Sequence, residues 1–300
     1  MMSGFRDAWL TLPGNARGAM WVVVGTFFFA LNDTFVKQAG LTIHPFQIGL
    51  TRYVLGIVLL LPVFIPMGRE GLATKRLGLH FLRALIAGSG QILVFYSVIL
   101  LMLADATAVS FSRPLFMTVL AVILLHEAVG WRRWAATTVG FIGVLVAVRP
   151  GDGPIDAGWL VGLTAAFLFS IGLILIRRLA STEPPNRILF YYHLFGSLLS
   201  LGPAIWMWKT PTPEEWLVLA MVGVMTTIAM FCFVRGFTVG EASILGPMEY
   251  IRLVYATALG YVFFAEVPGP WTWVGSVIII GSAFYIARNE AFRLRGGAGS

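Results

Sequence analysis

Five ionisable residues interrupt stretches of sequence that are otherwise apolar: Asp33, Arg52, Arg113, Glu249 and Arg252. An unpaired charge in apolar surroundings is costly, so such residues are kept for structure or for contact with a charged ligand. Asp33 and Arg52 fall at similar depths and are predicted to pair, as a buried structural ion pair or, alternatively, as an outer gate or a contact with a charged substrate. Glu249 and Arg252 are three residues apart and share a helix face, so they partly neutralise each other.

Uncharged polar residues in the same stretches are further candidates for a polar, substrate-binding cavity. They are Asn32, Tyr53, Ser89, Gln91, Tyr96, Ser110, Ser112, Tyr191, Tyr192, His193, Thr226, Thr227 and Tyr255. The alternative for each is a hydrogen bond between packed helices. Pro114 and Pro247 accompany Arg113 and Arg252, and a helix break is predicted at each because proline lacks a backbone donor.

No set of catalytic or metal-binding residues accompanies these groups. The four histidines fall in no metal-ligand spacing, and His126-Glu127 lacks the second histidine of H-E-x-x-H. Cys232 is the single cysteine, and no phosphate-binding G-x-x-x-x-G-K motif occurs. We therefore expect no metal, no cofactor and no ATP hydrolysis. These absences disfavour an intramembrane enzyme. A scaffold protein that moves no substrate is also disfavoured, because it would have no use for a buried polar cavity.

The elements that must position these residues are ten apolar stretches. The chain has 300 residues, 58% hydrophobic and only 12% charged, against about 25% charged for a soluble protein. A membrane helix needs about 20 apolar residues, and a helix satisfies its own backbone in lipid. The predicted fold class is therefore all-α integral membrane with ten transmembrane helices, near 19–36, 46–65, 82–102, 106–125, 133–148, 158–176, 188–208, 215–237, 241–264 and 270–287.

Lysine and arginine are distributed unevenly between the predicted loops. Fifteen of the 21 basic residues lie on the side that carries both termini, and only Lys37, Arg149 and Lys209 lie on the other. Because cytoplasmic loops collect basic residues, both termini are predicted to be cytoplasmic. The net charge of +7 therefore indicates topology, and nucleic-acid binding is not expected. The expected partners are a small-molecule substrate and the membrane lipid around the helices.

The two halves of the chain repeat each other at a nearly constant offset. Arg113, Glu127, Trp134 and Arg149 recur 139 residues later as Arg252, Glu266, Trp273 and Arg288. Gly18, Lys37, Pro45 and Gly56 have counterparts 140 residues later in Gly158, Arg177, Pro185 and Gly196, and Phe95, Asp105 and Ala106 have counterparts 136 residues later in Phe231, Glu241 and Ala242. Each half has five stretches, an odd number, so the second must insert upside down, as in many secondary transporters. The predicted division is 1–150, 151–290 and a flexible tail at 291–300.

Small residues recur every four positions in the sixth stretch, at Gly158, Gly162, Ala166 and Ser170. Such a stripe lets another helix approach closely. Packing within the chain is the first interpretation, and a homodimer contact is the alternative.

The segment from Asp105 to Pro150, with an acidic residue and alanine before the fourth stretch, then glutamate, tryptophan and a glycine-containing fifth stretch, resembles the EamA-type family of the drug/metabolite transporter superfamily. The same pattern returns as Glu241-Ala242, Glu266, Trp273, Gly275 and Gly281. The resemblance covers roughly residues 18–290. It implies a ten-helix basket of two inverted repeats around a central cavity. It also implies alternating access, in which the cavity opens first to one side of the membrane and then to the other.

The chain is also similar to YddG-like bacterial amino-acid exporters. The resemblance implies a non-ATP exporter of aromatic or other neutral amino acids, or of related small metabolites, in the bacterial inner membrane. The alternative is uptake or exchange of a larger metabolite such as S-adenosylmethionine or a nucleoside-like compound.

Overall fold

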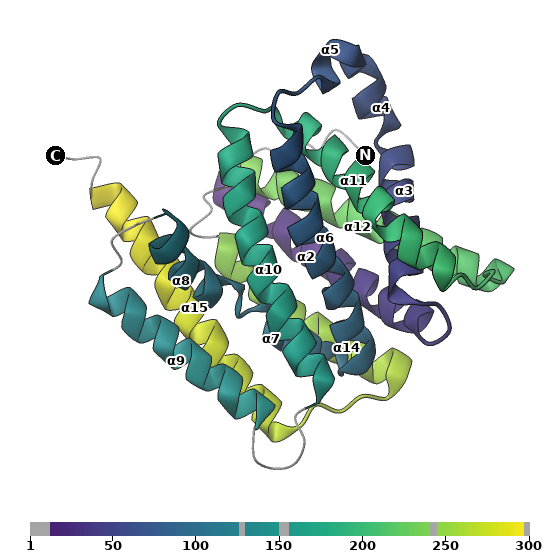
Figure 1. The fold of residues 1–300 in the computed structure, drawn as a ribbon. Coiled ribbons are helices and arrows are strands. Elements are labelled where there is room, and N and C mark those ends of the chain that lie inside the picture. Colours follow the sequence, from purple (N-terminus) through teal and green to yellow (C-terminus); the bar gives the residue numbers. More distant parts are fainter. Residues whose placement is uncertain (1–12, 126–129, 150–155, 241–244, 297–300) are drawn as a thin grey trace, which may run out of the picture.

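A computed structural model describes residues 13–125, 130–149, 156–240 and 245–296, and every element in these ranges is helical. The first half contains α2 (Gly14–Gly40), α3 (Pro45–Leu59), α4 (Leu61–Phe64), η1 (Ile65–Met67), α5 (Gly68–Leu72), α6 (Leu77–Leu100), α7 (Leu103–Ser110), α8 (Arg113–Leu125) and α9 (Trp131–Val148). The second contains α10 (Ala157–Ala180), α11 (Pro185–Trp206), α12 (Pro213–Val239), η2 (Gly246–Ile251), α14 (Arg252–Phe264) and α15 (Pro270–Gly296). Figure 1 shows α9 and α15 side by side at one edge of the bundle.

Local sequence signals set several helix boundaries. Pro45 and Pro185 occupy the first positions of α3 and α11, where the missing N–H would be unpaired in any case. Asp156 caps α10 by accepting a hydrogen bond from the Gly158 N–H at 2.7 Å. Thr212 and Glu215 form a reciprocal capping box at the start of α12. Proline and polar caps therefore place the starts of these helices where the apolar stretches begin.

Six described helical segments are long and apolar enough to cross a membrane, and a seventh is the pair Pro45–Leu59 and Leu61–Leu72, bent by 51°. The six are Gly14–Gly40, Leu77–Leu100, Leu103–Leu124, Ala157–Ala180, Pro185–Trp206 and Pro213–Val239. Two shorter apolar helices lie within α9 and α15. The chain is thus a multi-pass helical membrane protein, and the described parts of all ten predicted stretches are mainly helical.

Three predicted stretches differ from simple helices. The second bends at Leu60, before Pro62. The fourth is interrupted at Phe111-Ser112, between α7 and α8, and the ninth contains the 3₁₀ helix η2 before α14. At the C-terminus α15 continues to Gly296, so residues 291–296 are helical where the sequence predicts a tail. The repeat residues Glu127, Glu241 and Ala242 lie outside the described residues, as does the side chain of Arg288.

Helix packing in one half recurs in the other with the partners exchanged. The α2–α12 contact has its counterpart in α10–α6, α2–α14 in α10–α8, and α3–α12 in α11–α6. The α3–α11 and α9–α15 contacts join equivalent helices to each other. This pattern of exchanged contacts is what a two-fold axis between the halves produces.

The α3–α11 crossing shows the reciprocity at residue level. A methyl group built on Gly196 would lie 2.7 Å from the Tyr53 ring, and one built on Gly56 would overlap the His193 ring. Gly56 and Gly196 are repeat equivalents at an offset of 140, as are Tyr53 and His193. Each ring therefore occupies space left by the glycine of the opposite repeat, and the two helices approach closely there.

The small-residue stripe on α10 is used inside the chain. Gly158 faces Leu101, Gly162 faces Ser97 and Val109, and the Ser170 hydroxyl donates to the Arg113 carbonyl at 3.1 Å. These contacts support the intramolecular interpretation of the stripe and provide no support for a homodimer.

Adding a methyl group at the α3–α11 crossing should destabilise the protein. Gly196→Ala forces the Tyr53 ring to shift, and overpacking of this kind costs about 1–3 kcal/mol. Gly202→Ala, on the same helix, adds the same methyl group where no heavy atom lies within 4 Å. In thermal unfolding, Gly196→Ala should have the lower midpoint. Equal midpoints for the two variants would contradict close packing at the crossing.

Candidate functional site

A small cavity lies between the two halves, bounded by α2, α6, α7, α8, α10 and α14. Its polar lining consists of Asp33, Ser97, Ser110, Arg113 and Arg252. Valine, alanine and glycine residues of α6, α7 and α10 form the rest of the wall. The volume is about 20 Å³, which is room for roughly one water molecule. A ligand larger than a water molecule therefore does not fit in the cavity in this arrangement of the helices.

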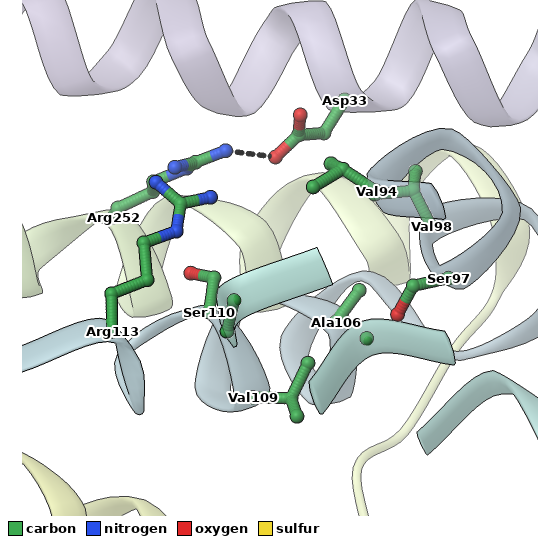
Figure 2. Close-up of a pocket in the computed structure, with 11 residues that line it drawn as sticks. Asp33, Val94, Ser97, Val98, Ala106, Val109, Ser110, Arg113 and Arg252 are labelled. Carbon is green, nitrogen blue, oxygen red and sulfur yellow. Dashed lines mark hydrogen bonds and ion pairs between the residues drawn. The ribbon is translucent and has the colours of Figure 1, made fainter. Parts of the chain in front are cut away.

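An ion pair between the two halves crosses this cavity. Arg252 Nη2 lies 2.5 Å from Asp33 Oδ2, and the side chains are only 18% and 7% exposed. Figure 2 shows the guanidinium group of Arg113 beside that of Arg252, with both on the side facing Asp33. Glu249 interacts electrostatically with both arginines. Asp33, Arg113, Glu249 and Arg252 form the central charge cluster, with two cationic and two acidic side chains.

Neighbouring polar residues fix the position of Asp33. The Asn32 amide donates to Asp33 Oδ1 at 3.4 Å, and the Thr226 hydroxyl of α12 donates to Asn32 Oδ1 at 2.8 Å. The acidic group is thus held through a chain of side chains that joins α2 to α12.

Helix breaks position both arginines of the cluster. Arg113 is the first residue of α8 and Arg252 the first of α14, and these two helices have the same length of 13 residues. Pro114 lies in the first turn of α8, and Pro247 lies within η2, the 3₁₀ segment before α14. The predicted break is therefore present at each proline. Arg113 Nε is buried without a hydrogen-bond partner, so its N–H group is available to donate to a ligand.

The predicted partnership between Asp33 and Arg52 is wrong. Asp33 pairs with Arg252, since α2 packs along α14 and places the two groups together. Arg52 lies instead with its guanidinium carbon 5.5 Å from the centre of the Tyr53 ring, beside α11. The two residues lie at similar depth, but the Arg52 side chain points toward Tyr53 and not toward Asp33.

Of the predicted cavity residues, Asp33, Ser110, Arg113 and Arg252 line the cavity. Ser110 and Ser112 donate to carbonyls of their own turn at 2.7 Å. Thr227 donates to the Gly223 carbonyl at 2.9 Å within α12, which is the structural alternative for that residue. Gln91 is half-buried on α6 and forms no hydrogen bond with a described residue.

The remaining predicted residues lie at other places in the bundle. The Tyr96 hydroxyl lies 3.0 Å from His44 Nε2, and burial lowers the pKa of His44, which favours the neutral ring. The Tyr255 ring packs edge-on against Phe27. Tyr53, Tyr192 and His193 cluster at the α3–α11 crossing, where the two tyrosine hydroxyls are 3.3 Å apart.

A second interaction between the halves had not been predicted. Lys37 pairs with Glu266 and donates to the Leu101 carbonyl, and Glu266 Oε2 accepts the Leu103 N–H at 2.8 Å. Lys37, Leu101, Leu103 and Glu266 form what we call the Lys37 latch. In the sequence, Lys37 follows Asp33 by four residues and Glu266 is the repeat counterpart of Glu127. Neither position indicates that these two residues pair with each other.

The loops gather at two opposite ends of the helices. At the Lys37 end, Thr42 donates to Glu215 at 2.5 Å and the Gln47 amide donates to the Lys209 carbonyl at 2.8 Å. At the other end, the loop containing Thr74 packs on the α10–α11 loop through Glu183.

Glu183 is the centre of that second loop contact. It accepts hydrogen bonds from the Thr74 hydroxyl and Arg187 Nη1, each at 2.7 Å. Burial opposes ionisation of Glu183, but these hydrogen bonds and the Arg187 charge outweigh it and lower its pKa. Glu183 is therefore ionised at neutral pH and ties the two loops together.

The fold and site define a class of protein: a multi-pass helical membrane protein of two related halves with a charged cavity between them. The EamA-like transporter family matches the chain twice, over residues 16–149 and 156–288. The chain belongs to this family, within the drug/metabolite transporter superfamily, and the family's members are transporters.

Several curated bacterial transporters are similar over nearly the whole chain. An S-adenosylmethionine uptake transporter of Rickettsia prowazekii is 30% identical, covering 91% of this chain and 93% of the relative. A riboflavin transporter of Vibrio cholerae is 28% identical, covering 93% and 95%. A pseudopaline exporter of Pseudomonas aeruginosa is 26% identical, covering 91% and 96%. A solved crystal structure shares the fold with a TM-score of 0.62 at 20% identity, covering 94% of this chain and 98% of the other.

The Asp33–Arg252 pair should show strong energetic coupling. Asp33→Asn or Arg252→Gln alone leaves a buried charge without its partner, whereas the double variant removes both. A double-mutant cycle on unfolding free energy should give a coupling of about 0.5–3 kcal/mol. The control cycle uses Lys209→Gln and Glu215→Gln, whose pair is exposed on the lysine side and should couple by at most about 1 kcal/mol. Equal coupling in both cycles would contradict a buried central pair.

Breaking the Lys37 latch should open the cavity. In a Cys232→Ser background, Ser110→Cys places a single thiol on the cavity wall. Glu266→Gln removes the charge that holds Lys37, so a water-soluble thiol reagent should modify this introduced thiol faster. Glu214→Gln, an exposed acidic residue at the start of α12, is the control and should leave the rate unchanged. If Glu266→Gln also leaves it unchanged, the latch does not close the cavity.

Proposed function

We propose that the chain is a secondary transporter of a small metabolite that carries an α-amino-acid group, with S-adenosylmethionine uptake as the leading case. The single observation that supports the substrate class is the central charge cluster. Arg113 has a buried Nε without a partner, suited to a carboxylate, and Asp33 and Glu249 provide negative charge suited to an ammonium group. A zwitterionic head group therefore matches both signs of charge in one cavity.

The named relatives favour S-adenosylmethionine over other compounds with this group. Four relatives at 30–31% identity are S-adenosylmethionine uptake transporters. Export of a neutral or aromatic amino acid is the second candidate. It is kept because the central charge cluster matches the head group alone, which an amino acid and S-adenosylmethionine share.

The proposed topology is ten spans in the bacterial inner membrane, arranged as two inverted five-helix repeats with both termini cytoplasmic. The bias of basic residues supports this orientation. On this topology the Lys37 end is outside, since Lys37, Arg149 and Lys209 are the few basic residues predicted there. The exchanged helix contacts support the inverted repeat, because a pseudo-two-fold axis in the membrane plane relates such halves.

Alternating access follows from these elements. The central ion pair and the Lys37 latch both join α2 to the α14 region. A substrate carboxylate that engages Arg113 and Arg252 competes with Asp33, and the ammonium group then compensates the released acid. Binding thus weakens one attachment between the repeats, which allows them to move relative to each other.

Transport is tested in proteoliposomes by counterflow. Vesicles preloaded with S-adenosylmethionine should take up the labelled compound, and a panel of amino acids loaded in its place tests the second candidate. Arg113→Gln should lower apparent affinity by roughly 10- to 100-fold, because a hydrogen bond to a charged group contributes about 1.5–3 kcal/mol. Arg69→Gln, an exposed arginine in the short helix α5, is the control. Absence of saturable counterflow with both kinds of compound would refute the proposal.

A further inference from the structure

A second pair of arginines, Arg83 buried and Arg52 half-buried, lies away from the cavity, where α3, α6 and α11 meet. Arg83 of α6 is 8% exposed, and its guanidinium carbon lies 4.6 Å from the centre of the Tyr192 ring. Arg52 of α3 lies 5.5 Å from the Tyr53 ring centre, and the two tyrosine hydroxyls are 3.3 Å apart. Arg52, Tyr53, Arg83 and Tyr192 form the arginine–tyrosine cluster.

Both arginines of this cluster have donors without partners. Arg83 Nη1 donates to the Ile188 carbonyl at 3.2 Å, but its Nε is buried and makes no hydrogen bond. Nε and Nη1 of Arg52 are likewise buried and without a hydrogen bond. A buried, unpartnered donor on a charged group is costly, so these positions call for an acceptor.

No described carboxylate supplies that acceptor. The ion pairs found in the described ranges join other residues, and Glu183, just before α11, is bound to Thr74 and Arg187. The groups that interact electrostatically with Arg83 are two tyrosines and two histidines, and none of them is a carboxylate: Tyr53, Tyr192, His80 and His193. In contrast to the central charge cluster, this one carries two positive charges and no negative charge.

The repeat shows that the framework does not need arginine here. At the 136-residue offset that relates α6 to α12, the equivalent of Arg83 is Leu219, which is 1% exposed. At the 140-residue offset that relates α3 to α11, the equivalent of Arg52 is Tyr192. Uncharged side chains therefore pack in the corresponding places of the other half, and the arginines are an addition to one repeat only.

We propose that Arg52 and Arg83 bind an anionic group, a carboxylate or a phosphate, at a site distinct from the central cavity. Guanidinium groups suit such ligands because their planar N–H donors match the oxygens of both. Contact with Tyr53 and Tyr192 holds the two groups in place. Arg83 lies eleven residues before Val94 of the cavity wall, about 16 Å along α6 at 1.5 Å per residue. The site does not depend on which substrate the central cavity takes.

Anion-dependent thermal stability tests the site in the purified full-length protein. Inorganic phosphate and acetate are titrated separately against chloride at constant ionic strength. A ligand that binds the folded state alone raises the unfolding midpoint with its concentration. One of the two anions should give a saturable rise, and its identity assigns the ligand as phosphate or carboxylate.

The variants locate the effect. Arg83→Leu reproduces the residue of the other repeat, and Arg52→Gln removes the second charge; each should weaken the anion's apparent affinity at least about tenfold. Arg69→Gln, an exposed arginine, should respond like the wild type. If Arg83→Leu does not fold, the wild type and Arg52→Gln decide the question. No saturable rise in the wild type, or an undiminished rise in Arg52→Gln, overturns the proposal. Because Arg113→Gln reports only on the central cavity, failure here is distinguishable from failure of the proposed transport.

Discussion

The structure depends on the pairing of Asp33 with Arg252, which joins the two halves of the chain at the level of the cavity. A charge on either helix alone would be costly in surroundings that exclude water, so each side chain requires the other. The helix breaks before Arg113 and Arg252 and the support from Asn32 and Thr226 all serve to hold opposite charges at one place. An attachment made of charge is one that a charged substrate can replace, which connects the stability of the closed bundle to its proposed transport function.

The second constraint is the close approach of α3 and α11. Gly56 and Gly196 leave room for His193 and Tyr53, and the contact is reciprocal between the halves. Because the contacts are reciprocal, the two repeats form both sides of the α3–α11 interface with the same kind of packing, a ring against a glycine. The halves are nevertheless unequal, because Arg83 has Leu219 as its counterpart. The symmetric elements explain how the bundle holds together, and the asymmetric charges are the places where specific ligands are expected.

Two interactions connect the halves, the central charge cluster and the Lys37 latch, and they differ in whether a ligand in the cavity can reach them. The central charge cluster borders the cavity and is within reach of a ligand, whereas the Lys37 latch includes backbone groups of Leu101 and Leu103 and lies one helical turn further along α2. The cavity holds roughly one water molecule, so both attachments are closed in this arrangement. In the proposed alternating access, opening at the Lys37 end requires the latch to separate, and α2 connects the latch to Asp33 because it carries both residues.

Composition and spacing were enough to predict the helical membrane class, the approximate positions of the helices, the repeat, and a polar cavity lined by Asp33, Arg113 and Arg252. These follow from local patterns and from the cost of charge in an apolar stretch, which require no knowledge of packing. The same patterns did not predict that Asp33 pairs with Arg252, that Lys37 pairs with Glu266, or that Tyr53, Tyr192 and His193 lie apart from the cavity. Those partners are separated by more than 100 residues in the chain, and only helix tilt and side-chain direction bring them together. The sequence places each polar residue at a depth along its helix, and this limits how far apart two side chains can be. It does not fix the direction in which each side chain points, so the packing of the helices decides which polar residues face one another.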